Sequence, residues 1–374
     1  MDEDKPFEHN NFKYTEQGIE YPNSIKFPRY LFKYYAINSN SLDSFVNEYL
    51  FFSHPNQLND VVDATDLLLN FEDCSEENYY GLYKYRTDRY NFDKNKIPNY
   101  EDAKKDDFRD LREFIYFVRF FSKGILSLTI HPYNKLMMAH YTFETGFVLE
   151  FEPNMLMTFL EKQIENKNVQ LFPMNYSETI KPINFFKESK KTIKKEKGII
   201  EHSLNFKIPF LYISSLKDEI WKYEEEWRIL IEKDNMGHIA PLLDFRKVPK
   251  EIKIDEGRKI KYDNSCINKI ILAPMFFNNS SFKSEISSNS YDRNYSLNRE
   301  FFQKKELLDS MRYFLNKICS IECKGKVFIQ CIDFCSHLKY ERILIELLDL
   351  DFSNDVISFK YSEKAYNFNI VTKS

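Results

Sequence analysis

Glycine is the residue whose scarcity most restricts the fold of this chain, because only eight glycines occur among 374 residues. None of them belongs to a G-x-G-x-x-G or a G-x-x-x-x-G-K-[ST] pattern, the loops that hold phosphates in Rossmann folds and P-loop enzymes. The G-x-S-x-G and H-E-x-x-H patterns of many hydrolases and zinc proteases are also missing. The sequence therefore argues against a Rossmann dehydrogenase, an ATPase, a GTPase and these hydrolase classes.

Composition indicates a folded, soluble protein. Hydrophobic residues make up 43% of the chain, and the net charge of -4 argues against nucleic-acid binding by bulk charge. The first 24 residues are polar, and no stretch is apolar enough for a signal peptide or a membrane span, so we expect a cytoplasmic protein with no membrane contact. Six cysteines without an export signal indicate reduced thiols.

The pattern of apolar residues predicts an α+β fold in three parts. Residues 1–27 read as a loose polar arm, because hydrophobic periodicity begins only at "YLFKYYAI". Residues 28–297 predict a main domain with a mixed, split β-sheet flanked by helices. Residues 298–374 predict a small C-terminal α/β appendage of helix, strand, helix and strand, in which residues 340–350 are the second helix. A lysine-rich helix is also expected around residues 187–198.

The segment "IWKYEEEWRILIE", residues 220–232, holds both tryptophans of the chain around three glutamates. It can be an amphipathic helix throughout, with Glu224 and Arg228 paired on its surface. Alternatively, a helix gives way near Glu225 to a strand, and alternation then sends Glu226 and Arg228 to one face. In the second interpretation Glu224 and Glu226 stand together at the entrance of a strand, and Arg228 keeps Glu226 ionised. Trp227 then faces the core.

Four blocks of the chain resemble one bacterial family, the domain of unknown function 2971. They are "LFKYYA", "LFFSHPNQLNDVVD", "LMMAHYTFETGFVLEF" and "KDEIWKYEEEWR", in that order, and the resemblance spans about residues 30–275. The chain departs from the family pattern at two positions: Tyr35 replaces an arginine of the first block, and Val61 replaces a proline of the second. Residues 298–374 lie outside the resemblance.

The order of these blocks is in turn similar to that of ADP-ribosyltransferases, including the mono-ADP-ribosylating toxins. That similarity implies NAD bound in the cleft of a split sheet without a glycine turn, and it implies Glu226 and Glu224 as the catalytic carboxylates. A carboxylate beside the ribose would stabilise the positive charge that develops when the nicotinamide bond breaks. We therefore expect an NAD-dependent ADP-ribosyltransferase, such as a bacterial toxin or anti-phage effector, with a protein or nucleic-acid acceptor.

The remaining candidates for NAD binding come from several blocks, and each also has an ordinary structural explanation. Asn-Asp pairs commonly form turns, a histidine among methionines is commonly a core residue, and a lysine is commonly exposed. The candidates are Tyr34, Asn59, Asp60, His140, Tyr141, Lys217 and Arg228.

Two other functions remain open. In a Mg²⁺-dependent nuclease, Asp60, Asp63 and Glu226 would bind the metal, since carboxylates suit that ion. In a non-catalytic binding or sensor module, Tyr35 in place of the arginine would mark the loss of a ligand contact, and residues 298–374 could bind a partner protein. Zinc at Cys319, Cys323, Cys331 and Cys335 is a further reading, but C-x-x-x-C is not the usual zinc spacing and we expect buried free thiols instead.

Overall fold

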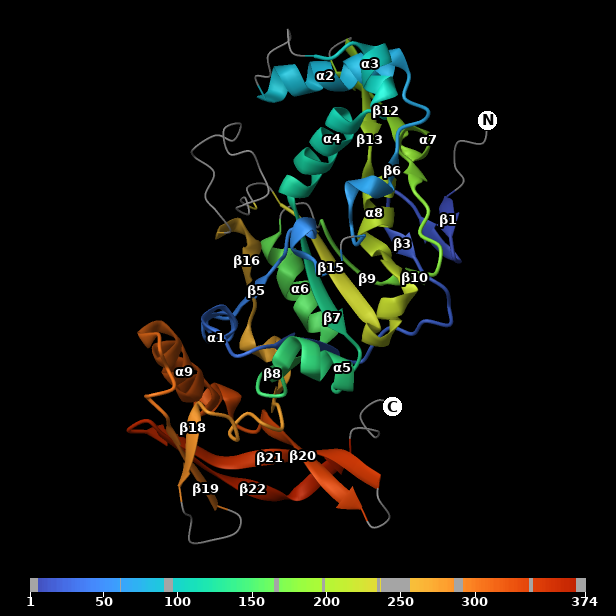
Figure 1. The fold of residues 1–374 in the computed structure, drawn as a ribbon. Helices are drawn as coiled ribbons and strands as arrows, with labels where there is room; N and C mark the ends of the chain where they lie inside the picture. The colour runs from blue at the N-terminus through green and yellow to red at the C-terminus, as the bar shows by residue number, and fades with distance from the viewer. Residues whose placement is uncertain are drawn as a thin grey trace.

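The computed structural model describes residues 6–60, 62–90, 97–164, 168–196, 199–233, 236, 256–285, 292–335 and 339–367. Helices cover both faces of a large central sheet, and the C-terminal strands extend that sheet to one side (Figure 1). The predicted α+β class and the mixed sheet are confirmed. None of the helices in these ranges has the length and apolar character needed to cross a bilayer.

Eleven strands form the central sheet. They are β4 (Leu31–Tyr35), β7 (Lys123–Thr129), β8 (Phe147–Phe151), β9 (Val169–Pro173), β15 (Glu226–Glu232), β17 (Ile267–Leu272), β18 (Phe282–Glu285), β19 (Asp292–Leu297), β20 (Val327–Cys335), β21 (Lys339–Ser353) and β22 (Val356–Asn367). Their spatial order is β18-β19-β22-β21-β20-β17-β8-β4-β7-β15-β9. β17 and β20 run parallel, so the C-terminal strands join the main sheet through this pair.

The strands β4 and β7 pair with each other over only a short stretch. These strands share one ladder pair, Phe32 with Thr129. Further along β7, the backbone of Ile125 pairs with Ser53 instead of β4, with N···O distances of 2.8 and 2.9 Å. The amine of Lys33 donates to the Ser127 carbonyl at 3.1 Å, in the stretch where β4 leaves β7. The eleven strands nevertheless form one hydrogen-bonded sheet, in which the ladder between β4 and β7 is the shortest.

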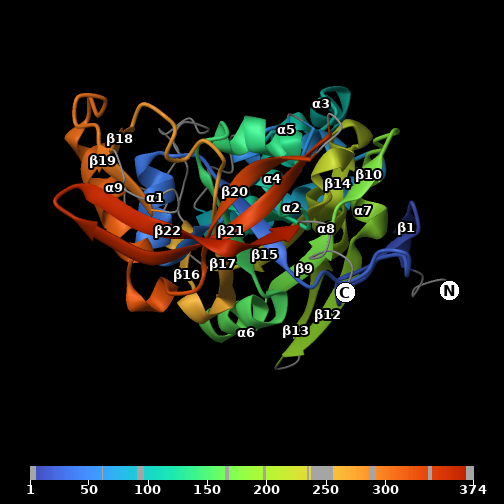
Figure 2. The ribbon, with the colours of Figure 1, turned by 90° about the horizontal axis from the view of Figure 1, so that it is seen from below.

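One face of the sheet is covered by α1 (Ser39–Val46), α6 (Pro153–Gln163) and α9 (Lys305–Ile318). The core beneath them receives alternate residues of the strands, among them Trp227 and Ile229 of β15. α1 and α9 lie side by side in both ribbon views (Figures 1 and 2), and the rings of Phe45 and Phe314 are 5.1 Å apart. The C-terminal helix therefore packs on the same core as the first helix of the chain.

The opposite face has two separate covers. On β7, β15 and β9 lies an apolar cluster that also contains residues of α2 (Glu76–Tyr90), α3 (Tyr100–Lys105), α4 (Arg109–Phe121), α7 (Phe185–Glu188) and α8 (Lys207–Ser215). Over β4 and β8 lies α5 (Lys135–Met137), which continues as one turn of π-helix (Met138–Thr142). Thr129 of β7 is the ladder partner of both Phe32 and Glu226, so it joins the strands under the two covers.

Further strands lie outside the central sheet. They are β1 (Phe7–His9), β2 (Phe12–Tyr14), β3 (Ile19–Glu20), β5 (Tyr49–Phe51), β6 (Leu69–Asn70), β10 (Asn175–Ser177), β11 (Ile183–Asn184), β12 (Lys190–Glu196), β13 (Ile199–Asn205), β14 (Leu216–Asp218) and β16 (Lys259–Lys261).

Three predicted elements need correction. The stretch 6–27 is not a loose arm, because β1, β2 and β3 form a small sheet and Tyr14 is fully buried, with its hydroxyl 3.0 Å from that of Ser215. The expected lysine-rich helix is instead the antiparallel pair β12 and β13. Residues 340–350 lie in β21, not in a helix, since pairing with β20 and β22 on both sides overrides the helical preference of leucine and glutamate.

Gly146 is the glycine whose replacement we expect to damage this fold most clearly. A Cβ atom at this position would lie 1.9 Å from the Tyr35 carbonyl oxygen, between β8 and β4. Gly146→Ala should therefore lower the free energy of unfolding by about 1–3 kcal/mol or more, as overpacking does. Gly81→Ala is the matched control, because nothing lies within 4 Å of its added Cβ and alanine favours a helix. Chemical denaturation of both variants measures the difference, and equal stabilities would contradict the close approach.

Candidate functional site

A tight turn at Glu225 directs the side chains of Glu224 and Glu226 toward one another, where both bind Lys217. Asp218 caps the 3-10 helix Glu219–Glu224 by accepting from the Ile220 amide at 2.9 Å. Glu225 follows with φ of +40° and is exposed, and β15 begins at Glu226. The predicted change from helix to strand is confirmed. The shared orientation of the two glutamates comes from the left-handed residue between them, however, and not from strand alternation.

Lys217 of β14 lies between the two glutamates. Its ammonium group donates to Glu224 Oε2 at 2.6 Å and to Glu226 Oε2 at 2.8 Å. The exposed fractions are 2% for Lys217, 3% for Glu224 and 4% for Glu226. Two carboxylates this close would repel each other in a dry interior, so the shared ammonium group is what makes the pair possible.

Arg228 holds Glu226 from the other side. Its Nε donates to Glu226 Oε1 at 2.7 Å, and its Nη1 donates to Asp63 Oδ1 at 2.7 Å and to the Ser214 carbonyl at 2.9 Å. Its Nη2 also contacts the Asp63 carboxylate, so Asp63 is bound by both ends of the guanidinium group. Burial by itself would raise the pKa of Glu226, but the charges of Arg228 and Lys217 outweigh burial and hold the pKa well below its usual value.

A layer of aromatic and amide side chains separates this charged network from solvent. The Tyr141 hydroxyl donates to Glu224 Oε1 at 2.5 Å, and the exposed Asn59 amide donates to the Tyr141 oxygen at 2.7 Å. The exposed His140 lies 3.5 Å from the Tyr223 hydroxyl through Nδ1. The half-buried Trp221 ring lies 5.2 Å from the Lys217 ammonium. Glu224 is thus linked through two hydrogen bonds to an exposed side chain. The carboxylate of Glu226 is instead bound by the buried Lys217 and Arg228.

Six of the nine predicted residues therefore meet in one network, and His140, Tyr34 and Asp60 lie at its margin. Tyr34 faces the same side of the sheet, but its hydroxyl is used by the backbone: it donates to the His131 carbonyl at 3.0 Å and accepts from the Asn134 amide at 3.1 Å. Asp60 accepts from the Val62 amide at 3.0 Å through one oxygen. Its other carboxylate oxygen is buried and has no hydrogen-bond partner among the described residues.

Three contributors were not predicted in these roles. Asp63 was considered only as a metal ligand, but it is the bidentate partner of Arg228. Thr129 Oγ1 donates to the Glu224 carbonyl at 2.6 Å, and the Tyr176 hydroxyl accepts from the Glu226 amide at 2.8 Å. Thr129 and Tyr176 come from remote strands and carry no motif. Only the β7 alternation that sends Ser127 and Thr129 to one face could have suggested Thr129.

The low pKa of Glu226 predicts how stability depends on pH. A carboxyl whose folded pKa lies below its unfolded value of roughly 4.3 stabilises the fold above that value and loses this contribution as the pH falls. Urea midpoints of the wild type should therefore decrease on acidification from about pH 5. The Glu226→Gln variant should show a flatter curve over the same window, because it has no proton to bind at this position. Parallel curves would contradict the assigned direction.

The alternative metal sites find little support in the geometry. Arg228 occupies oxygens of both Asp63 and Glu226 that a metal ion would need. In the parts of the chain that the structure describes, no group of three or more His, Cys, Asp or Glu side chains could hold a metal ion. Cys319, Cys323 and Cys331 are free thiols, and burial raises the pKa of Cys319 to about 12. The Cys335 side chain and Val61 lie outside what is described.

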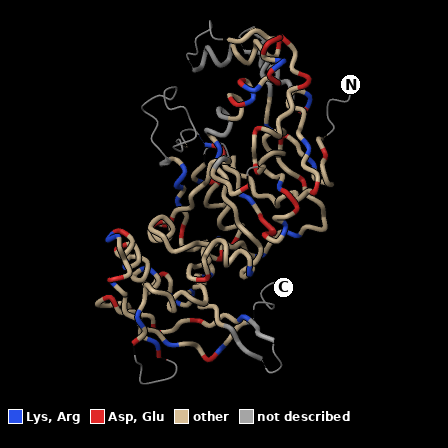
Figure 3. Tube along the Cα trace, in the orientation of Figure 1, with Lys and Arg blue, Asp and Glu red and all other residues tan. Residues whose placement is uncertain are grey.

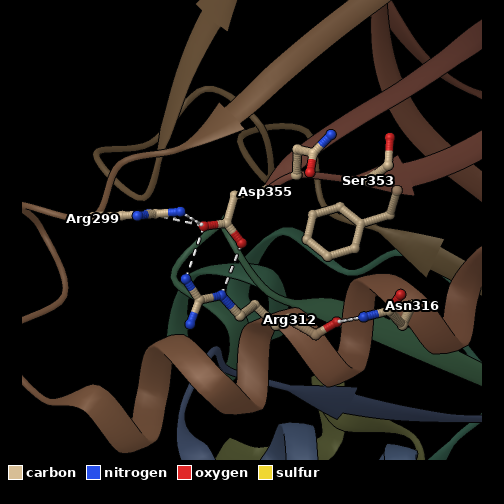
Figure 4. Close-up of a pocket in the computed structure, with 7 residues that line it drawn as sticks. Arg299, Arg312, Asn316, Ser353 and Asp355 are labelled. Atoms are coloured by element: carbon tan, nitrogen blue, oxygen red, sulfur yellow. Dashed lines mark hydrogen bonds and ion pairs between the residues drawn. The ribbon is translucent and has the colours of Figure 1, made fainter.

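A hollow lies on the C-terminal part of the chain (Figure 4), away from the glutamate network, and is lined by Arg299, Arg312, Asn316 and residues 352–355. Both arginines already donate to Asp355, at distances of 2.6 to 2.8 Å. Asn354 and Asp355 have positive φ in the turn from β21 to β22. The residues that line this hollow therefore hold a tight β-hairpin in place. Basic and acidic positions are interspersed along the described trace (Figure 3), as expected for a solvated surface.

Comparison with known proteins gives one match. Residues 137–229 match the family described as "Protein of unknown function (DUF2971)". The matched range contains Tyr141, Lys217, Glu224, Glu226 and Arg228, so the predicted resemblance is confirmed for the part of the chain that forms most of the network. The two earlier blocks, with Asn59, Asp60 and Asp63, lie outside it. No curated protein and no solved structure matches the chain.

Proposed function

We propose that the protein is an NAD-consuming ADP-ribosyltransferase whose catalytic groups are Glu226 and Glu224. One observation carries the proposal: two glutamates flanking a left-handed turn share one buried ammonium group, and one of them is linked to the exposed Asn59. The arrangement gives a buried, ionised carboxylate beside a second carboxylate that is hydrogen-bonded through Tyr141 to an exposed side chain. A bacterial toxin or an anti-phage effector would be a suitable setting for such an enzyme.

The chemistry assigns a different role to each carboxylate. The bond between nicotinamide and the ribose C1′ breaks, and nicotinamide leaves with the bonding electron pair as a neutral molecule. Glu226, kept ionised by Arg228 and Lys217, stabilises the positive charge that develops on the ribose. A nucleophilic atom of the acceptor then bonds to C1′, and its proton passes to Glu224. The scarcity of glycine is consistent with NAD held by side chains.

Substrate access requires the outer layer to open. Glu226 is nearly inaccessible, and the Tyr141 hydroxyl occupies the solvent side of Glu224. A ribose hydroxyl can replace the Tyr141 donor, because both are hydroxyl groups that donate to a carboxylate. Tyr141 lies in the π-helical turn, which is followed by Phe143 and Glu144, two consecutive residues with positive φ. Single π-turns occur frequently at functional sites.

A non-catalytic binding or sensor module is the second candidate, and two observations favour it. The carboxylates of Asp63 and Glu226 are bound by cations of the chain itself, as in a structural ion-pair network. Tyr35, which stands where the family pattern has an arginine, is buried and stacks on Phe147 with ring centroids 5.0 Å apart. This position of β4 therefore carries no positive charge that could bind an anionic ligand.

One experiment separates the three functions. The wild-type protein is incubated with NAD labelled in the adenylate phosphate, together with cell lysate or purified nucleic acids, with and without Mg²⁺. Covalent transfer of label to a protein or nucleic acid supports the proposed transferase. Degradation of nucleic acid that needs Mg²⁺, without transfer of label, would replace it with a nuclease. Inertness in every arm would favour the binding or sensor module.

A further inference from the structure

Arg342 connects the C-terminal strands to the segment that carries Tyr141 of the candidate site. It belongs to β21 and is mostly buried, and its guanidinium carbon lies 4.0 Å from the centroid of the Tyr133 ring. Its Nη1 also forms an ion pair with Glu144 at 3.2 Å. Tyr133 precedes α5, and Glu144 follows the π-helical turn. Arg342 therefore contacts both ends of the segment that carries His140 and Tyr141.

The loop that Arg342 contacts is hydrogen-bonded to the glutamate turn. The Asn134 side chain donates to the Tyr223 carbonyl at 2.7 Å and accepts from the Leu136 and Met137 amides at 3.0 and 3.2 Å. One residue thus begins α5 and also fixes the backbone immediately before Glu224. A displacement of this loop would change the distance between Tyr141 and Glu224.

Apolar contacts from the same strands support the segment from below. Phe328 of β20 and Leu344 of β21 are buried in one cluster with Tyr34, Met137 and Met138. Tyr141 and Tyr223 pack at the edge of this cluster. The chain following residue 298, predicted as an appendage, therefore packs against the segment that carries Tyr141.

We propose that Arg342 is a positioning residue, which holds the segment 131–144 so that Tyr141 and Glu224 meet. The cation on the Tyr133 ring and the ion pair with Glu144 are interactions of a partly desolvated guanidinium group, whose planar shape suits both partners. The structural part of this inference stands independently. Its consequence for catalysis rests on the proposed transferase function.

Three variants test the inference. Arg342→Met removes the charge but keeps an unbranched side chain, and Arg342→Lys keeps the charge for Glu144 but loses the planar group. Lys360→Met is the matched control: it removes an exposed lysine of the adjacent strand whose ion-pair partner is Asp349. Hydrogen exchange of residues 131–142 and the steady-state kinetics of nicotinamide release are measured for each variant and for the wild type.

In Arg342→Met we expect amide exchange of residues 131–142 to rise by about tenfold, with the remainder of the central sheet unchanged. We expect kcat to fall by about 10- to 100-fold while KM changes little, because misplacement of catalytic groups acts on the reaction step. Arg342→Lys should recover part of both effects, and Lys360→Met should match the wild type.

Exchange and kcat equal to those of Lys360→Met would overturn the inference, as would a rise in exchange spread evenly over the whole chain. Faster exchange limited to residues 131–142 in a protein whose wild type releases no nicotinamide would support the positional role of Arg342. That result would overturn the proposed transferase instead, so the two failures can be distinguished.

Discussion

The Lys217→Met variant is expected to lose about 3–5 kcal/mol of unfolding free energy at neutral pH, the usual effect of removing one partner of a buried ion pair. Lys217 is the group that donates to both Glu224 and Glu226, at 2.6 and 2.8 Å. Without it, Glu224 retains Tyr141 and Glu226 retains Arg228, but the two buried negative charges face each other with no cation between them.

The same argument predicts that the loss depends on pH. When the pH falls, one of the two glutamates in Lys217→Met can bind a proton, which removes the repulsion. The stability difference between Lys217→Met and the wild type should therefore shrink as the pH is lowered from 7 to about 4. Urea unfolding across this range measures it.

Lys222→Met is the matched control for this prediction. Lys222 is an exposed lysine of the same short segment and pairs with Glu219 at 2.6 Å. Its replacement should leave the unfolding free energy close to that of the wild type, because exposed ion pairs stabilise little. If both variants unfolded at the same urea concentration, Lys217 would not support the two glutamates as described.

The local structure around Glu226 could be predicted from sequence, because the residues that decide it are neighbours. Tryptophan and isoleucine after Glu225 favour a strand, and alternation then places Trp227 in the core and Arg228 beside Glu226. The identity of the other partners could not be predicted in the same way. Lysine is rarely buried, and only the path of the chain brings Lys217 to Glu226 and the remote Asp63 to Arg228.

The errors at the C-terminus have a related physical cause. Residues 340–350 combine leucine, isoleucine and glutamate, so short-range preference alone leaves helix and strand open. Pairing of β21 with β20 and β22 decides the outcome, and these contacts are invisible in a local window. The same pairing brings Arg342 to Tyr133, which is why the connection between the C-terminal strands and the site did not emerge from the sequence.

Glu226→Gln is expected to have the largest effect on activity. The replacement keeps the shape of the side chain but removes the negative charge that the developing positive charge on the ribose requires. We expect nicotinamide release to fall by about 100- to 1000-fold, the range seen when one preorganised electrostatic group is removed from an active site. Circular dichroism at the assay temperature checks that the variant remains folded.

Glu225→Gln provides the matched control for activity, because Glu225 belongs to the same glutamate run but is exposed and contacts only His131 among the interactions described for its side chain. The most direct measurement is the rate of nicotinamide release from NAD by the wild type, Glu225→Gln and Glu226→Gln, assayed side by side. The proposed mechanism predicts equal rates for the first two and a rate at least about 100-fold lower for the third. A wild-type rate no greater than that of NAD in buffer, or equal rates for all three proteins, would contradict it.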